Sequence, residues 1–364
     1  MSGPTVADQL AACPHYSVCG GCFDLTDKAD ILPASLRRAG FDVGAVALAA
    51  GGLYQRRRME LAFRRAGEVV LGLHRHRGHD IVDLTECRVL HPELARLLPG
   101  LRAVLGRCDL LRRQGSLLGN LTLTGADILL RGDQAASRAD RARLAAFAGE
   151  QGIARISGAV GGEAPETLAQ HRVPELRFAG HAVVPPPGGF LQATEAGEAA
   201  IRDAVLAGLP KAGRKFRIAE LYAGCGTLSF ALAEHAVVDA YEGDMAAHAA
   251  LAAACRGAML SGRINPMRRD LARQPLMPDE LARIGCLVLD PPQAGAPAQM
   301  AMILAATEAQ RPARVIMVSC DPEGLARDAG VLRRAGYGLV GATAIDQFIG
   351  TPRVESVSVF GRGK

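Results

Sequence analysis

Cys320 is the residue of this chain whose position is most typical of a nucleophile. It ends the apolar stretch VIMVSC and is followed by Asp321 and Pro322, a pair typical of the first positions of a helix. A thiolate beside a helix N-terminus is stabilised, so the pattern predicts a lowered pKa, although the charge of Asp321 acts in the opposite direction. A buried, unreactive side chain is the alternative, since free cysteines are among the most buried residues.

A thiolate next to a methyl donor suits methylation of a pyrimidine ring. Thiolate addition at C6 converts C5 into a nucleophilic carbon that attacks the methyl group. A base must then remove the C5 proton before the enzyme is released. Glu355, at the start of the last predicted strand in TPRVESVSVF, is the candidate base, and an exposed strand-end glutamate is the alternative.

The stretch ELYAGCGTLSF predicts a ligand-binding turn between a strand and a helix. Gly224 and Gly226 allow a tight turn at the carboxyl edge of a sheet. Ser229 replaces the third glycine of a dinucleotide fingerprint, so a pyrophosphate cradle is not expected. Glu242 ends the next strand, where it could accept hydrogen bonds from ribose hydroxyls, and Asp290 ends another before two prolines. These features favour S-adenosylmethionine over a nicotinamide cofactor, with a plain glycine turn as the alternative.

Three cysteines crowd the N-terminus in the pattern C-x5-C-x2-C, formed by Cys13, Cys19 and Cys22. With a distant fourth cysteine, this spacing suits either tetrahedral zinc or an iron–sulfur cluster. The beginning MSGPTVADQL lacks the features of a secretion signal, and no apolar run is long enough to span a bilayer. We therefore expect a cytoplasmic protein with no membrane partner, in which the nine cysteines do not form a disulfide framework.

The length of 364 residues predicts two domains. Before residue 190, short strand-like pieces alternate with helical segments, which predicts an α+β region. The stretch VVPPPGGFLQATEAGE at 183–198 is typical of a linker. Beyond it, strands and helices alternate, which predicts an α/β domain with a doubly wound, mostly parallel sheet. We expect domains at 1–188 and 189–364.

The positive charge is carried almost entirely by arginine. The net charge is +5, and residues 56–77 concentrate arginine and histidine. This strip suits either contact with RNA phosphates or a solvated surface. Aromatic residues make up 4% of the chain, without tryptophan, which argues against an extensive base-stacking platform.

Several motifs together resemble those of the bacterial 23S rRNA (uracil-C5)-methyltransferases, relatives of the tRNA enzyme that makes ribothymidine. They follow the order of that family and are CPHYSVCGGC, TECRVL, GGFLQAT, LYAGCGTLSF, LDPPQAG, VSCDPEGLARD and TPRVESVSVF. The resemblance implies a Rossmann-like class I methyltransferase domain after an α+β domain. Because Cys13 comes so early, it corresponds to the form without the N-terminal TRAM barrel, which leaves RNA binding to the first domain.

The resemblance also assigns residues. It implies Cys320 as the nucleophile and Glu355 as the general base. The side chains and turn implied for S-adenosylmethionine are Gln192, Tyr222, Gly224, Gly226, Thr227, Glu242, Asp270 and Asp290. The ligands implied for a 4Fe–4S cluster are Cys13, Cys19, Cys22 and Cys87. The tRNA relatives lack this cysteine set, which favours rRNA. Gln293 and Asp321 stand where the family usually has arginine and asparagine.

The sequence therefore predicts an S-adenosylmethionine-dependent RNA (uracil-C5)-methyltransferase that acts on a specific uridine of 23S rRNA, with the base turned out of its stack. RNA is the expected partner, DNA is not, and a monomer is expected. One alternative is methylation of a tRNA uridine. Methylation of cytosine at C5 is disfavoured, because such enzymes often have a cysteine where this chain has Gln293. A non-catalytic RNA-binding or ribosome-assembly protein with a methyltransferase fold is the third alternative.

Overall fold

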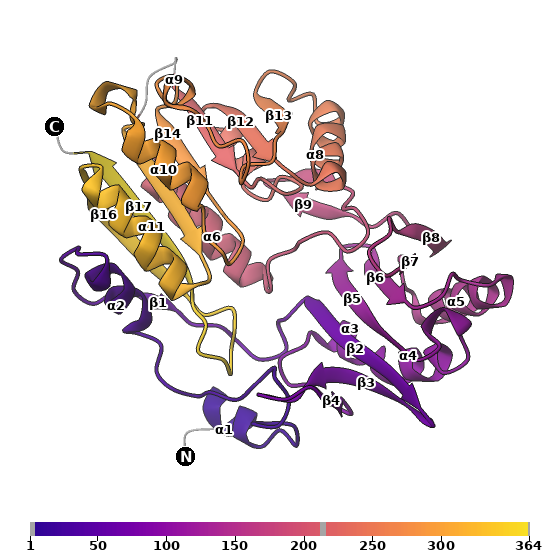
Figure 1. Cartoon of the computed structure of the whole chain (residues 1–364). Coiled ribbons are helices and arrows are strands. Elements are labelled where there is room, and N and C mark those ends of the chain that lie inside the picture. Colours follow the sequence, from indigo (N-terminus) through magenta and orange to yellow (C-terminus); the bar gives the residue numbers. More distant parts are fainter. Residues whose placement is uncertain (1–3, 212–215, 363–364) are drawn as a thin grey trace.

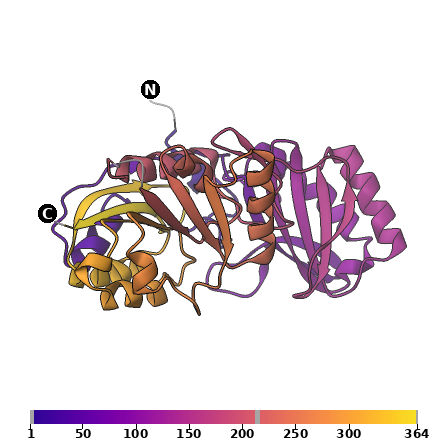
Figure 2. The same cartoon turned by 90° about the horizontal axis from the view of Figure 1, so that it is seen from above.

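The computed structural model describes residues 4–211 and 216–362. Two large sheets form two parts that lie side by side, and the chain passes between them in the segments 50–57 and 184–194 (Figures 1 and 2). Within the described ranges, no helix combines the length and the apolar character needed to cross a membrane.

The first sheet has seven strands in the order β4-β3-β2-β5-β6-β7-β8. These strands are β2 (Arg58–Ala66), β3 (Glu68–His74), β4 (Ile81–Asp83), β5 (Gln114–Thr122), β6 (Gly125–Gly132), β7 (Arg155–Val160) and β8 (Glu166–Gln170). All neighbours are antiparallel except β6 and β7. The smaller elements of this half of the chain are α1 (Val6–Ala11), α3 (Pro92–Ala95), α4 (Leu98–Leu105), η1 (Asp109–Leu111), α5 (Arg138–Gln151), β9 (Leu176–Phe178) and β10 (His181–Val183).

Alternation of side chains along β2 fixes which face of the first sheet is buried. Met59, Leu61 and Phe63 are buried and pack with α4 and α5 in one apolar core. The pattern of LTLTGADILLRG predicts a single strand-like piece, but the structure divides this segment into the end of β5, a turn and β6. Gly125 begins β6 with a φ of 127°, a conformation that glycine adopts readily.

The second sheet has eight strands in the order β1-β16-β17-β15-β14-β11-β12-β13. These strands are β1 (Leu48–Ala49), β11 (Arg217–Leu221), β12 (Val237–Glu242), β13 (Ile264–Arg268), β14 (Cys286–Leu289), β15 (Arg314–Ser319), β16 (Tyr337–Ile345) and β17 (Glu355–Arg362). Only β17 runs antiparallel to its neighbours. The predicted α/β fold with a mostly parallel sheet is confirmed.

Helices cover both faces of the second sheet, which makes a three-layer domain. Apolar side chains of one face pack with α2 (Ile31–Arg38), α9 (Pro278–Leu281), α10 (Pro297–Ala305) and α11 (Pro322–Arg334). Those of the other face pack with α6 (Glu195–Gly208), α7 (Ser229–Ala233) and α8 (Met245–Gly257). A short 3-10 turn, η2 (Glu308–Gln310), precedes β15.

The N-terminal residues contribute to both parts of the molecule. β1 pairs in parallel with β16 and so belongs to the second sheet, and α2 packs against α11 on one face of that sheet (Figure 1). Both elements precede the first sheet in the sequence. The division at residues 188 and 189 stays a prediction. The structure places an early segment of the chain beside the last strands.

The arginine strip at 56–77 is not one uniform surface. Arg57 is buried and forms an ion pair with Glu198 of α6. Arg65 donates hydrogen bonds to the carbonyl oxygens of Leu105 and Cys108. The exposed arginines of the strip are Arg64, Arg75 and Arg77. Part of the strip therefore holds the two parts together, and only the remainder faces solvent.

Candidate active site

The carboxyl edge of the second sheet collects most of the predicted site residues. β13, β12, β11, β14 and β15 are adjacent and parallel, so they end at the same edge. In that spatial order, the residues at or just beyond these ends are Asp270, Glu242, Gly224, Asp290 and Cys320. β17 is antiparallel and begins at this edge with Glu355. The topology thus brings residues from distant parts of the sequence to one line, where ligands bind in such folds.

The turn after β11 is shaped by three residues with positive φ. Tyr222, Gly224 and Gly226 have φ values of 65°, 58° and 105°. A Cβ atom added at Gly226 would lie 2.7 Å from Phe230 and 2.8 Å from Leu251, whereas one added at Gly224 would meet no atom within 4 Å. Gly226 is therefore required for packing, whereas Gly224 borders open space.

Glu242 supports this turn with its carboxylate. One oxygen accepts the backbone N–H of Gly224 and the other accepts that of Asp244, each at 2.7 Å. Each oxygen keeps a second lone pair, so the carboxylate can also accept a hydrogen bond from a ligand hydroxyl.

Three further predicted residues lie close to the turn. Tyr222 is half-buried, and burial, followed by the charges of Asp328, Asp270 and Glu242, raises the pKa of its phenol. Asp270 is exposed and caps its own loop by accepting the backbone N–H of Ala272 at 3.1 Å. Thr227 is half-buried between the turn and α7. These residues surround the turn without bonding one another directly in the described structure.

A line of buried polar side chains connects Asp290 to Glu355. Gln192 donates from Nε2 to Oδ2 of Asp290 at 3.3 Å. Gln347 donates from Nε2 to Oε1 of Gln192 and to Oε2 of Glu355, both at 2.8 Å. The two glutamines and Glu355 are at most 5% exposed. The interpretation of Glu355 as an exposed strand-end glutamate is therefore wrong.

Cys320 is accessible, unlike the other cysteines outside the four predicted metal ligands. Cys108, Cys225, Cys255 and Cys286 are all buried, whereas Cys320 is half-buried. β15 and β17 are antiparallel, and Ser319 of β15 pairs with Ser356 of β17. The residue after Ser319, Cys320, therefore lies beside the residue before Ser356, Glu355. The interpretation of Cys320 as a buried core residue is wrong.

The predicted lowering of the Cys320 pKa is also wrong. Burial, followed by the charge of Glu355, raises the pKa of the thiol to about 11, and Arg353 opposes this shift. The predicted helix start is confirmed, since Asp321 caps α11 by accepting the N–H of Gly324 at 2.7 Å. The carboxylate that disfavours the thiolate is therefore Glu355, which arrives through the fold, rather than the sequence neighbour Asp321.

The carboxyls of Asp290 and Glu355 both hold protons more strongly than usual. Burial raises the pKa of Asp290 to about 7. Burial and the charge of Asp290 raise the pKa of Glu355 to about 8, while the hydrogen bond from Gln347 acts in the opposite direction. A carboxyl that titrates near neutral pH is suited to accept a proton during a reaction.

Sequence reasoning missed two residues of this site. Gln347 lies in the loop after β16, where no sequence pattern marks it. Glu220 is buried in β11, bonds to the hydroxyl of Ser229, and has a pKa raised to about 8, mainly by burial. The signal for Glu220 was available, because a glutamate within the apolar strand RIAEL must be paired or protonated.

The four predicted metal ligands line one cavity of about 730 Å³ between the two parts. They come from the N-terminal segment and the loop after β4 and are Cys13, Cys19, Cys22 and Cys87. Burial, followed by the charges of the other three thiols, raises the pKa of Cys22 to about 12. Among residues 4–211 and 216–362, no group of three or more histidine, cysteine, aspartate or glutamate side chains has the arrangement of a metal site. The donor atoms are of the right kind and share one cavity, but they are not arranged as a coordination sphere.

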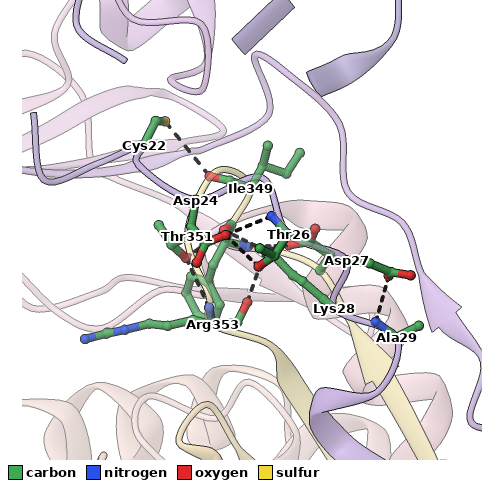
Figure 3. Close-up of polar contacts among 11 residues, drawn as sticks. Cys22, Asp24, Thr26, Asp27, Lys28, Ala29, Ile349, Thr351 and Arg353 are labelled. Carbon is green, nitrogen blue, oxygen red and sulfur yellow. Dashed lines mark hydrogen bonds and ion pairs between the residues drawn. The ribbon is translucent and has the colours of Figure 1, made fainter. Parts of the chain in front are cut away.

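The same N-terminal segment holds the loop between β16 and β17 (Figure 3). Lys28 is 6% exposed, and its ammonium group donates to Asp346 at 2.7 Å and to the carbonyl oxygens of Phe348 and Arg353 at 2.9 and 3.2 Å. The backbone N–H groups of residues 23 and 24 donate to the carbonyl of Gly350. The loop 346–354, which contains Gln347 and leads to Glu355, is thus held in place by the N-terminal segment that also carries Cys13, Cys19 and Cys22.

Comparison with known proteins places this site in context. No protein-family model matches the chain. An uncharacterized RNA methyltransferase of Brucella suis is 36% identical over 98% of this chain and 85% of its own length. A 23S rRNA (uracil-C5)-methyltransferase of Aromatoleum aromaticum is 31% identical over 96% of this chain and 85% of its own length. The solved structure of the Pyrococcus abyssi tRNA (uracil-54, C5)-methyltransferase with S-adenosyl-L-homocysteine aligns with a TM-score of 0.66 at 17% identity, over 91% of this chain and 81% of that one, and supports the fold.

Proposed function

Because this chain belongs to the family of RNA methyltransferases that includes a 23S rRNA (uracil-C5)-methyltransferase, we propose that it methylates C5 of a uridine in 23S rRNA. The observation that carries the proposal is the pairing at the carboxyl edge of the second sheet. A half-buried thiol, Cys320, lies beside a buried carboxyl, Glu355, whose pKa is raised to about 8. These are the nucleophile and the base that C5 methylation requires.

In the proposed reaction, the Cys320 thiolate forms a bond to C6 of the uracil. The electron pair of the C5–C6 double bond then moves toward C5 and the C4 carbonyl oxygen, so that C5 acquires nucleophilic character. C5 would then accept the methyl group, while the bond between the methyl carbon and the donor sulfur breaks and its electron pair stays on the sulfur. Glu355 takes the C5 proton, the C5–C6 double bond forms again, and the sulfur–C6 bond breaks to release the thiolate. Because C5 exchanges a hydrogen for a methyl group, one base and one nucleophile complete the step.

S-adenosylmethionine would bind around the open space above Gly224 and supply an electrophilic methyl group. The absence of any atom within 4 Å of a Cβ built at Gly224 supports this placement. Glu242 has lone pairs free for ribose hydroxyls, and Gln192 and Asp290 border the same edge. Tyr222, Gly226, Thr227 and Asp270 complete the proposed pocket.

We further propose that Cys13, Cys19, Cys22 and Cys87 hold a 4Fe–4S cluster. Four thiols that line one cavity are a donor set suited to iron–sulfur or zinc, and a bound cation would offset the repulsion between their thiolates. Visible absorbance and iron content of protein purified without air test this: Cys87→Ser should lose both, and Cys108→Ser, a buried cysteine outside the cavity, should keep both. A colourless protein that contains zinc would contradict the cluster.

The methylation proposal is tested with labelled S-adenosylmethionine and RNA transcripts. Cys320→Ala should abolish methylation, whereas Cys255→Ala, which changes a buried thiol of α8, should not. Glu355→Gln should accumulate a protein–RNA adduct that survives SDS, because the C5 proton is no longer removed. Methylation that survives Cys320→Ala would refute the mechanism.

The choice of transcript separates the remaining alternatives. We propose 23S rRNA, so label should appear as 5-methyluridine in rRNA fragments rather than in tRNA or as 5-methylcytosine. RNA binding without label transfer would instead favour a non-catalytic assembly protein.

A further inference from the structure

Gln347 occupies a central position in the buried polar line of the active site. Its amide nitrogen carries two hydrogens, and each is donated to a different residue, Gln192 on one side and Glu355 on the other, both at 2.8 Å. We propose that Gln347 is a positioning residue that fixes the carboxylate of the base Glu355 relative to Gln192, the side chain assigned to the methyl donor. This inference rests on the proposed methyltransferase function.

The hydrogen bonds determine the orientation of each amide in the line. Gln192 accepts from Gln347 through Oε1 and can therefore donate from Nε2 to Asp290 only in this orientation. Gln347 is the one member of the line that donates in both directions. Its loss would leave Gln192 with only its hydrogen bond to Asp290 in the described structure, and would remove the side-chain donor that orients the carboxylate of Glu355.

The surroundings of Gln347 show that this orientation is maintained at a cost. Its own Oε1 atom is buried and has no hydrogen-bond partner in the described structure. That oxygen is directed at Gly197 in the first turn of α6, where an added Cβ would approach it to 2.7 Å. A residue that only filled space would be better apolar, because a buried oxygen without a partner is unfavourable. The two donated hydrogen bonds account for the presence of an amide.

The consequence for the reaction follows from the charge of the base. Glu355 is active only when ionised, and the N–H of Gln347 stabilises that form against the effect of burial. Gln347 therefore both orients the carboxylate and increases the fraction that is ready to accept the C5 proton.

The test replaces Gln347 by methionine, which has a similar length but no donor. We expect kcat at pH 7 to fall about tenfold with an unchanged KM for RNA, and the pH of half-maximal rate to rise by about one unit. The SDS-stable protein–RNA adduct should also accumulate, because proton removal becomes slow. If the methionine variant does not fold, Gln347→Asn, which keeps the donors on a shorter side chain, should shift the same profile in the same direction.

Gln299→Met is the matched control. Gln299 is equally buried, but its side chain bonds to the backbone of Leu276 and, in the described structure, to no member of the line from Asp290 to Glu355. Its loss should lower stability without moving the pH profile. The positioning role would be overturned if the pH–rate profile of Gln347→Met matched those of wild type and Gln299→Met. If methylation still required Cys320 in that case, the methyltransferase function would remain intact. Methylation that does not require Cys320 would instead overturn the function itself.

Discussion

Replacement of Lys28 by methionine should destabilise the active-site loop 346–354. The ammonium group is 6% exposed and has three oxygen partners, namely the carboxylate of Asp346 and the carbonyls of Phe348 and Arg353. Removal of one partner from a buried ion pair costs about 3 to 5 kcal/mol, because the other charge stays buried and unpaired. Asp346 keeps 18% side-chain exposure, which allows some hydration, so we expect about 3 kcal/mol.

The loss should appear first as local opening of the loop. Native-state hydrogen exchange of residues 346–354 measures that opening, and thermal unfolding reports any wider effect. Lys211→Met provides the control, since it removes an exposed lysine. In a double-mutant cycle with Asp346→Asn, the two changes should not be additive, because they remove the same ion pair. If the free energies of loop opening and of unfolding differ from those of the Lys211→Met protein by less than about 0.5 kcal/mol, Lys28 does not hold the loop in place.

Two other predictions concern the carboxyl edge. The pKa of Glu355 is about 8 in the folded protein, whereas its ordinary value is 4.5. Between these two pH values the folded state binds more protons than the unfolded state, so the free energy of unfolding should fall as the pH rises through this window. Glu355→Gln should remove part of that fall, as measured by thermal unfolding at pH 5 and pH 8.5; an unchanged difference would contradict the raised pKa. Gly226→Ala should destabilise the fold by about 2 to 4 kcal/mol, because its Cβ would overlap Phe230 and Leu251. Gly224→Ala should lower the free energy of unfolding by only about 1 kcal/mol but weaken the binding of S-adenosyl-L-homocysteine, as measured by calorimetry. If the two glycine variants lost equal stability and Gly224→Ala bound this ligand as well as wild type, the proposed pocket at Gly224 would be wrong.

The sequence predicted those parts of the site that depend on local chain geometry. Neighbouring residues predict a strand that ends at Cys320, one residue beyond the observed end of β15, and the capping of α11 by Asp321, because caps and strand ends are set within a few positions. The line of residues along the carboxyl edge also followed, since parallel strands that alternate with helices must end at one edge.

The parts that could not be predicted depend on contacts between distant segments. Gln347 meets Gln192 across 155 positions of the sequence, and no local pattern marks Gln347 or indicates that the two side chains meet. The pKa of Cys320 is raised in part by Glu355, which follows it by 35 positions but lies on the next strand of the sheet. The ion pair between Lys28 and Asp346 likewise requires the N-terminal segment to fold back onto the loop between the last two strands.

The mutual effect of Cys320 and Glu355 suggests an order of charges in the proposed reaction. Cys320 is half-buried and Glu355 is buried, and the charge of Glu355 raises the pKa of the Cys320 thiol. Because the repulsion between two negative charges is reciprocal, a thiolate at Cys320 also disfavours ionisation of Glu355. The thiolate is needed first, while Glu355 can remain protonated. Once the sulfur is bonded to C6, it carries no charge, so Glu355 releases its own proton to solvent more readily and is ionised at the step that requires a base. A pair that would be poorly suited to simultaneous ionisation is thus well suited to sequential use, and the raised pKa values are compatible with catalysis.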